Sequence, residues 1–217
     1  FRIPLQSRIG TGYVHSSAHV DEQAAIDELV RSLNGAERLT DPRIIRTRNG
    51  RSRRSWVGNC VAFALSSGFL EPLESTAIQF VDFACRRFLQ CLPSSEFEPA
   101  AIAKFNAQMA GLYDDVRDFL GLHFTLGDRD DTPYWRSIRH DVKRSDQLEQ
   151  CLALWRDALP DVYDPRPNDV FTFWSVSAVL FGKGFYDRPP RVGTDLLPRE
   201  VWDNYVRRFL RLRPPLL

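Results

Sequence analysis

The stretch Trp56–Phe80, WVGNCVAFALSSGFLEPLESTAIQF, contains the point at which the residue pattern of the chain changes from strand-like to helical. A strand-like segment ends at Gly58-Asn59, where a glycine without a Cβ lets the backbone approach a ligand closely. After Ser75, apolar residues recur at intervals of three and four, as they do on one face of a helix. We therefore expect a β-rich first third and a mainly helical remainder.

The proline-containing turn EPLEST leads into this helix. Ser75 is a good N-cap residue, and if Thr76 and Ala77 open the helix, their backbone N–H groups lack intrahelical partners and favour an anion. Glu74 lies beside this helix start. Its carboxylate either stabilises only the helix dipole or acts as a general base or charge stabiliser on a bound substrate. Glu71 has the same two interpretations, and we prefer the purely structural one for it.

The residues before this stretch predict short strands and one helix. Residues 1–17, FRIPLQSRIGTGYVHSS, alternate loosely and contain β-favouring side chains, so we expect strands there. A helix of about three turns is expected after Asp21, with Gly35 at the position of a left-handed cap. The pair Asn49-Gly50 predicts a tight hairpin with a strand on either side.

The residues after the stretch predict several helices. Apolar side chains at helical spacing indicate two long amphipathic helices, over Ile78–Leu89 and Ile102–Leu120. Shorter helices are expected around Leu148–Ala158, Val170–Leu180 and Arg199–Leu210, separated by turn-forming segments rich in aspartate and proline.

Composition excludes several classes of partner. The 217 residues include 29 basic and 28 acidic side chains, so no overall field attracts nucleic acid or anionic lipid. Six arginines lie between residues 43 and 54, but aromatic residues are nearly absent there, which favours a solvated face or contacts to an anionic cofactor over nucleic acid. With no long apolar run and no signal-peptide pattern, we expect a soluble cytoplasmic protein without a membrane partner.

The chain lacks the usual metal and phosphate motifs. Its cysteines form no CxxC pair, no histidine has zinc-ligand spacing, and no GxGxxG or GxxxxGK[ST] loop occurs. We therefore expect no metal site and interpret the cysteines as isolated thiols. They are Cys60, Cys85, Cys91 and Cys151. The abrupt start within the apolar segment FRIPL suggests a fragment.

The segment GNCVAFALSSGFLEPLESTAIQF resembles the signature stretch of flavin-dependent halogenases related to tryptophan halogenase. FRIPLQSRIGTGYVHSS resembles the segment that ends in the WxWxIP motif of that family, and FNAQMAGLYDDVRDFLGLHFTLGDRDDTPYWR and WSVSAVLFGKG extend the resemblance over nearly the whole chain. The resemblance implies part of a flavin-monooxygenase-like fold of the α/β class, present here as an α+β fragment. Residues 1–74 would complete an FAD-binding domain, and residues 75–217 would form a mainly helical substrate domain.

The resemblance also implies a reaction and its partners. Members of the family react reduced FAD with oxygen, so that chloride or bromide becomes hypohalous acid and halogenates an electron-rich aromatic carbon. A separate flavin reductase would supply reduced FAD, and the substrate would be an indole- or tryptophan-like arene.

Individual residues receive roles from the same resemblance. Glu74 would act at the halogenation site, orienting the oxidant or accepting charge and a proton from the arene. The backbone amides of Thr76 and Ala77 would hold the halide, in agreement with the argument from the helix start. The flavin contacts and the residues lining its approach would be Leu65, Ile78, Gly58 and Asn59.

Some family features lie outside these residues or differ. The GxGxxG loop, the catalytic lysine and both tryptophans of WxWxIP are absent from the 217 residues, and Ala77 stands where the family commonly has glycine. Two other interpretations therefore remain open. They are an FAD-dependent aromatic monooxygenase of the same fold and a non-catalytic helical binding fragment.

Overall fold

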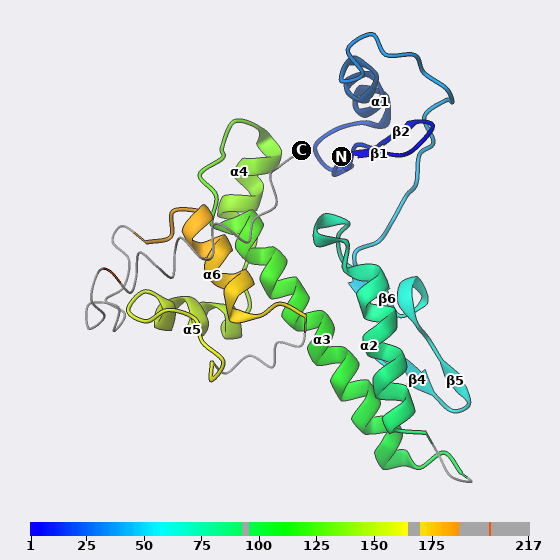
Figure 1. Cartoon of the computed structure of the whole chain (residues 1–217), viewed down its shortest axis with the longest axis vertical. Coiled ribbons are helices and arrows are strands. Elements are labelled where there is room, and N and C mark those ends of the chain that lie inside the picture. Colours follow the sequence, from blue (N-terminus) through cyan, green and yellow to red (C-terminus); the bar gives the residue numbers. More distant parts are fainter. Residues whose placement is uncertain (93–95, 165–169, 187–199, 201–217) are drawn as a thin grey trace.

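A computed structural model describes residues 1–92, 96–164, 170–186 and 200 of the chain (Figure 1). Within these ranges it contains α-helices, two short 3-10 helices (η) and three two-stranded antiparallel sheets. In chain order the elements are β1 (Arg2–Pro4), β2 (Ile9–Thr11), α1 (Glu22–Arg31), β3 (Gly50–Arg51), β4 (Trp56–Val57), β5 (Cys60–Val61), η1 (Ala64–Ser66), β6 (Gly68–Phe69), η2 (Leu73–Ser75), α2 (Thr76–Gln90), α3 (Pro99–Thr125), α4 (Pro133–His140), α5 (Asp146–Trp155) and α6 (Phe173–Gly182).

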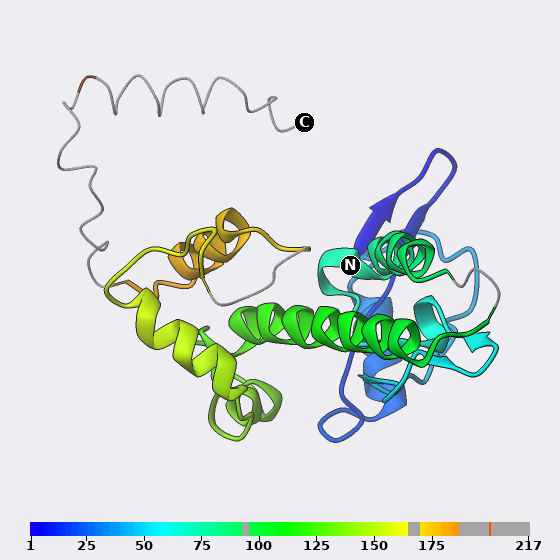
Figure 2. The same cartoon turned by 90° about the horizontal axis from the view of Figure 1, so that it is seen from below.

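The long helix α3 connects the two packed regions of the chain. One half of α3 lies beside α2 and the sheet strands β4 to β6, and its other end meets α4, α5 and α6 (Figures 1 and 2). The helix begins with proline, whose missing N–H costs nothing in a first turn. As its spacing predicted, α3 buries apolar residues along its whole length. These include Phe105, Met109, Leu112, Val116, Phe119 and Leu120.

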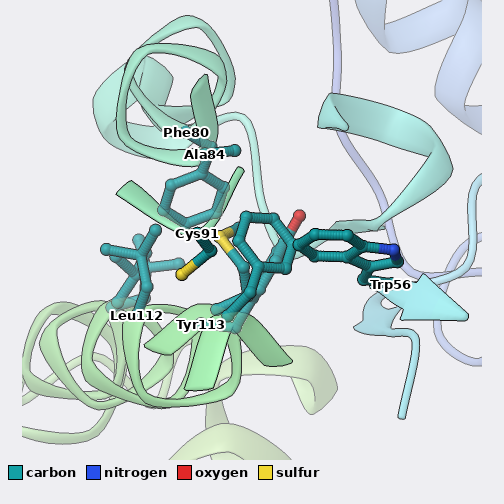
Figure 3. Close-up of a cluster of buried hydrophobic side chains, with 10 residues drawn as sticks. Trp56, Phe80, Ala84, Cys91, Leu112 and Tyr113 are labelled. Atoms are coloured by element: carbon teal, nitrogen blue, oxygen red, sulfur yellow. The ribbon is translucent and has the colours of Figure 1, made fainter. Parts of the chain in front are cut away.

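Two hydrophobic clusters use opposite ends of this helix. The first joins α2, α3 and the segment around Trp56 (Figure 3). In it, Phe80 of α2 meets Tyr113 of α3 edge-on, with 4.6 Å between ring centroids. The second cluster joins the end of α3 to α5 and α6 through Phe119, Leu148 and Leu180, among others.

Trp56 attaches the start of the Trp56–Phe80 stretch to α3. Its side chain is 1% exposed and packs edge-on against Phe88 and Phe105, at centroid distances of 5.1 and 5.6 Å. Asn106 of α3 accepts a hydrogen bond from the Trp56 N–H at 2.8 Å and donates one to its C=O at 2.9 Å. The amide side chain thus pairs with the backbone of β4 much as a neighbouring strand does.

The predicted hairpin at Asn49-Gly50 is wrong. Instead, β3 pairs with β6, with Gly50 opposite Phe69 and Arg51 opposite Gly68. A Cβ on Gly68 would lie only 2.8 Å from the Gly50 carbonyl oxygen, so this close pairing requires glycine. Residues 41–49 form no strand, and Ile45 among them is 72% exposed, so this segment offers no buried apolar face to a second hairpin strand.

The two-residue hairpin lies at Gly58-Asn59, where β4 turns into β5. Gly58 has a φ of +56°, as the first position of a tight hairpin turn requires. With only two or three residues in each strand, the first third contains small sheets rather than being β-rich, and the described chain is mostly helical.

The remaining element predictions had mixed outcomes. The strands near residue 1 are confirmed as the β1–β2 hairpin, and α1 begins after Asp21, whose carboxylate accepts the Ala24 N–H at 2.9 Å. That helix ends at Arg31, so Gly35 is left-handed but lies beyond its cap. The helices predicted after residue 75 are confirmed as α2, α3, α5 and α6, whereas the one around residues 199–210 lies outside the described residues.

One face and one helix differ from the sequence-based prediction. In α2 the buried residues are Thr76, Phe80 and Ala84, while Ile78 is 85% exposed on another face. Helix α4 was not predicted, although Thr132 caps it by accepting the Trp135 N–H at 3.3 Å. No helix in the described part of the chain is long and apolar enough to cross a membrane.

Candidate functional site

The start of α2 is reached through a constrained turn. After β6 the chain passes Glu71 and Pro72, forms η2 and enters α2 at Thr76. Ser75 has a left-handed φ of +52°, and its N–H donates to the Pro72 carbonyl at 3.2 Å. Ser75 therefore occupies the expected N-cap position, but its side chain makes no capping hydrogen bond. The first N–H groups of α2 lie beyond this turn.

A small pocket lies between β6, the following turn and the first turn of α2. Its lining includes Gly68, Leu70, Glu71, Thr76, Ala77 and Phe80. Thr76 is buried and Ala77 is exposed, so the two residues expected to hold a halide lie together at this pocket. N–H groups at the start of a helix carry partial positive charge, which favours a bound anion such as a halide. Glu74 lies in η2 directly before them, and its catalytic role stays a prediction.

Glu71 is better placed in the structure than its sequence position suggested. The side chain lines the pocket beside Thr76 and Ala77 and is only partly exposed. Burial raises the pKa of its carboxyl, and a hydrogen bond from the Leu73 N–H offsets part of that rise. The sequence alone favoured a purely structural role, because most glutamates lie at the surface and take no part in chemistry. Its position in the pocket could not be read from that pattern.

Tyr134 of α4 is the ionisable side chain that responds to the charge on Glu71. Burial raises the pKa of the Tyr134 phenol, and the negative charge of Glu71 raises it further. The ring of His19 meets Tyr134 edge-on, with 5.5 Å between centroids. The segment before α1 and helix α4 therefore come together near the same region as the pocket.

Tyr113 supports the loop on the other side of the pocket. Its hydroxyl donates to the Gly68 carbonyl at 3.3 Å, and burial raises the pKa of this phenol while a bond with Ser67 lowers it. The Ser67 and Ser55 hydroxyls are 2.7 Å apart in the interior. These contacts hold the loop around η1 against α3. Tyr113 and Asn106 are supporting residues that helical spacing places on α3 but does not connect to the loop.

The expected flavin contacts do not all lie at the pocket, since Trp56, beside Gly58-Asn59, packs against Phe88 near the opposite end of α2. Leu65, 71% exposed, lines an open groove with Arg48 and Arg51, and this groove shares Gly68 and Phe69 with the pocket. Ile78 extends from α2 outside both, and Gly58 and Asn59 lie in the exposed β4–β5 turn.

These residues fit a flavin, because Leu65 and Ile78 present large exposed apolar side chains that a flat ring system can cover. A metal site requires side chains of a different kind. Among the described residues no group of three or more His, Cys, Asp or Glu side chains could hold a metal ion. None of the four cysteines forms a disulfide, and Cys91 and Cys151 are buried.

Comparison with known proteins identifies the family. The family model described as tryptophan halogenase matches residues 1–198. The chain belongs to the tryptophan halogenase family. This confirms the resemblance carried by the EPLEST stretch.

Curated relatives in this family match over part of their length. Tryptophan 7-halogenase KtzQ of Kutzneria sp. (strain 744) is 39% identical over 216 residues, which cover 93% of this chain and 40% of KtzQ. Tryptophan 7-halogenase RebH of Lentzea aerocolonigenes is 38% identical over 174 residues, covering 80% of this chain and 32% of RebH. The chain thus spans at most about 40% of the length of these two relatives.

Solved structures in the family share the fold. Tryptophan 6-halogenase SttH from Streptomyces toxytricini superposes with a TM-score of 0.86 at 35% identity, covering 94% of this chain and 40% of SttH. BrvH, a flavin-dependent halogenase from Brevundimonas sp. BAL3, superposes with a TM-score of 0.82 at 36% identity, covering 95% of this chain and 41% of BrvH. The small sheets and helices described above are therefore a portion of the flavin-dependent halogenase fold.

Proposed function

We propose that this chain forms the carboxy-terminal part of a flavin-dependent halogenase that acts on an electron-rich arene of the indole or tryptophan type. Residues 1–74 contribute to the FAD-binding domain, and residues 75–217 form the mainly helical cover over the substrate. The observation that carries the proposal is the pocket at the start of α2, where Thr76 and Ala77 lie together in a chain of this family. The GxGxxG loop and the catalytic lysine belong to parts of the enzyme outside these residues.

Each residue has a defined task in this proposal. Bound reduced FAD, delivered by a separate flavin reductase, supplies with oxygen the oxidising power that converts chloride or bromide to hypohalous acid. The N–H groups of Thr76 and Ala77 hold the halide by charge-assisted hydrogen bonds. The exposed side chains of Leu65 and Ile78 cover the apolar ring system and exclude water from it.

The arene chemistry involves the turn before α2. As the carbon–halogen bond forms, the attacked ring carbon must lose its proton, and a carboxylate nearby stabilises the positive charge that precedes this loss. Glu74 takes this role, because it lies in η2 immediately before the halide residues. The Gly58-Asn59 turn borders the approach of the flavin, where the positive φ of Gly58 keeps the backbone open.

The test is a product analysis with the flavin-loaded protein that contains these residues. The protein receives reduced FAD from a reductase, oxygen, bromide or chloride, and a panel of indoles, and the products are separated and identified by mass. A halogenated indole supports the proposal. A hydroxylated indole instead would identify an aromatic monooxygenase, and the absence of both products, with flavin bound, would favour a non-catalytic role.

A further inference from the structure

The pocket at the start of α2 contains one ionisable group. Among the described side chains that line it, only Glu71 can carry a charge, and the others are apolar, glycine or threonine. A carboxylate and a halide in one small pocket repel each other strongly because little water lies between them. The charge of Glu71 therefore bears directly on whether an anion enters.

The position of Glu71 is set by its neighbours. It lies between β6 and Pro72, which restricts the backbone around it, and its carboxylate accepts the Leu73 N–H. The side chain is thus tied by a hydrogen bond to the turn that leads into Thr76.

We propose that Glu71 gates the halide pocket by its charge, so that halide binds while the Glu71 carboxyl is protonated and is repelled once it ionises. This inference rests on the proposed function, because it concerns the same halide site. Glu71 is a regulating residue in this scheme and takes no part in the arene chemistry. No covalent step is involved, since halide binding is coupled only to uptake of a proton.

The surroundings of Glu71 favour the protonated state. Burial raises the pKa of its carboxyl, and a halide bound nearby raises that pKa further. The described ionisable side chains near it are Tyr134 on α4, which is neutral below its own raised pKa, and His19, whose ring meets Tyr134, while Glu74 follows three residues later along the chain in η2. Within the described part of the chain, no arginine or lysine contributes to the pKa of Glu71. Halide affinity is therefore highest at low pH and falls up to tenfold per pH unit above the pKa of Glu71.

The experiment measures bromide affinity of the flavin-loaded protein from pH 5 to 9 for the wild type and Glu71→Gln. We expect the wild type to lose affinity as pH rises, and Glu71→Gln to bind bromide with nearly constant affinity. The matched control is Glu37→Gln, which removes the same charge from an exposed loop and should keep the wild-type slope. An unchanged slope in Glu71→Gln would overturn the gate.

Two further measurements separate this inference from the proposed function. Calorimetry of the wild type in buffers of different ionisation enthalpy should show proton uptake with bromide, and its absence at every pH from 5 to 9 would overturn the gate without requiring any variant to fold. A wild type that binds no bromide at any pH would contradict the halide site itself, and with it the gate. Bromide binding without linked protons would contradict the gate alone.

Discussion

The turn from Glu71 to Ala77 concentrates the residues whose individual roles can be separated. Thr76 and Ala77 act through backbone N–H groups, whereas Glu71 and Glu74 act through carboxyls, so different substitutions test each of them. Side-chain changes that keep the backbone N–H should spare halide binding. Changes that neutralise one carboxyl should alter either the pH dependence or the turnover.

Removal of the Ala77 N–H should weaken halide binding. Proline at the second position of a helix loses no intrahelical hydrogen bond, so Ala77→Pro deletes the N–H at limited structural cost. We expect the KM for bromide to rise by about 10-fold or more, as for loss of one charge-assisted hydrogen bond. Ala77→Gly keeps the N–H and is the control. Equal KM values for the two variants, at equal melting temperatures, would contradict a role for this amide.

Glu74→Gln separates catalysis from helix stabilisation. If Glu74 assists loss of the arene proton, the isosteric change should lower turnover by on the order of 100-fold or more and leave folding and flavin binding nearly unchanged. If the carboxylate only stabilises the helix dipole, unfolding free energy should fall by about 0.3–1 kcal/mol and turnover should stay normal. Rapid-mixing measurements of flavin oxidation are made alongside product yield. A normal flavin reaction with little product supports the catalytic role, and normal product yield supports the purely structural one.

At the scale of elements, α3 organises the site by holding β4 and the η1 loop. Asn106 makes two hydrogen bonds to the backbone of Trp56, so Asn106→Ala leaves a buried N–H and C=O without partners. We expect unfolding free energy to fall by about 2–4 kcal/mol, from about 1–2 kcal/mol for each group. Asn49→Ala, in an exposed loop, is the control and should lie within about 0.5 kcal/mol of the wild type in urea unfolding.

The phenol of Tyr186, which follows α6, should make the stability of the fold depend on pH. Burial, followed by the charge of Asp164, raises its pKa from 10.0 to about 12, and its hydroxyl has no hydrogen-bond partner among the described residues. Between these values the unfolded chain releases the proton and the folded chain keeps it, so stability falls as pH rises from about 10 to 12. Tyr186→Phe should flatten this loss in urea unfolding at several pH values. An equally steep loss in the variant would contradict this assignment.

The elements that sequence predicts well are those with long periodic patterns. Helix α3 follows from the spacing between Phe105 and Leu120, and Asp21 marks the start of α1, because both signals are local. The pairing of β3 with β6 depends on Gly68 fitting against Gly50, a contact between residues distant in sequence. The Asn49-Gly50 pair therefore suggested a hairpin that tertiary packing does not form.

The candidate site shows the same division. Thr76 and Ala77 were predicted as halide residues because a helix start has a local signature, the family resemblance supplied Glu74, Leu65 and Ile78, and all of these roles stay predictions. The pocket-lining position of Glu71 depends on how β6 meets α2, which no local pattern specifies. The outward direction of Ile78 was missed for a similar reason, since the apolar pattern of α2 fits two faces and packing against α3 selects that of Phe80.

At the scale of the whole molecule, the described chain exposes much apolar surface in the regions expected to meet the flavin and its domain. Ile78 and Leu89 are 85% and 64% exposed on α2, and Leu65 is 71% exposed beside it. The β1–β2 hairpin also presents exposed apolar residues, among them Ile3 and Ile9. Large apolar side chains exposed in such number favour association with another surface.

We therefore expect the 217 residues expressed alone to self-associate and to bind FAD less than stoichiometrically, because no GxGxxG loop is present to hold its phosphates. Light scattering after size exclusion gives the mass, and ultrafiltration with absorbance gives the bound flavin. The double variant Ile78→Gln, Leu89→Gln should shift the mass toward the monomer, since it removes apolar area without touching the buried face of α2. The matched control Arg86→Gln, Gln90→Ala changes exposed polar positions on the same helix and should leave the association unchanged. A wild-type chain that runs as a monomer with a cooperative melt would show that these apolar side chains need no cover, and stoichiometric FAD binding would show that the phosphate site does not depend on a GxGxxG loop elsewhere.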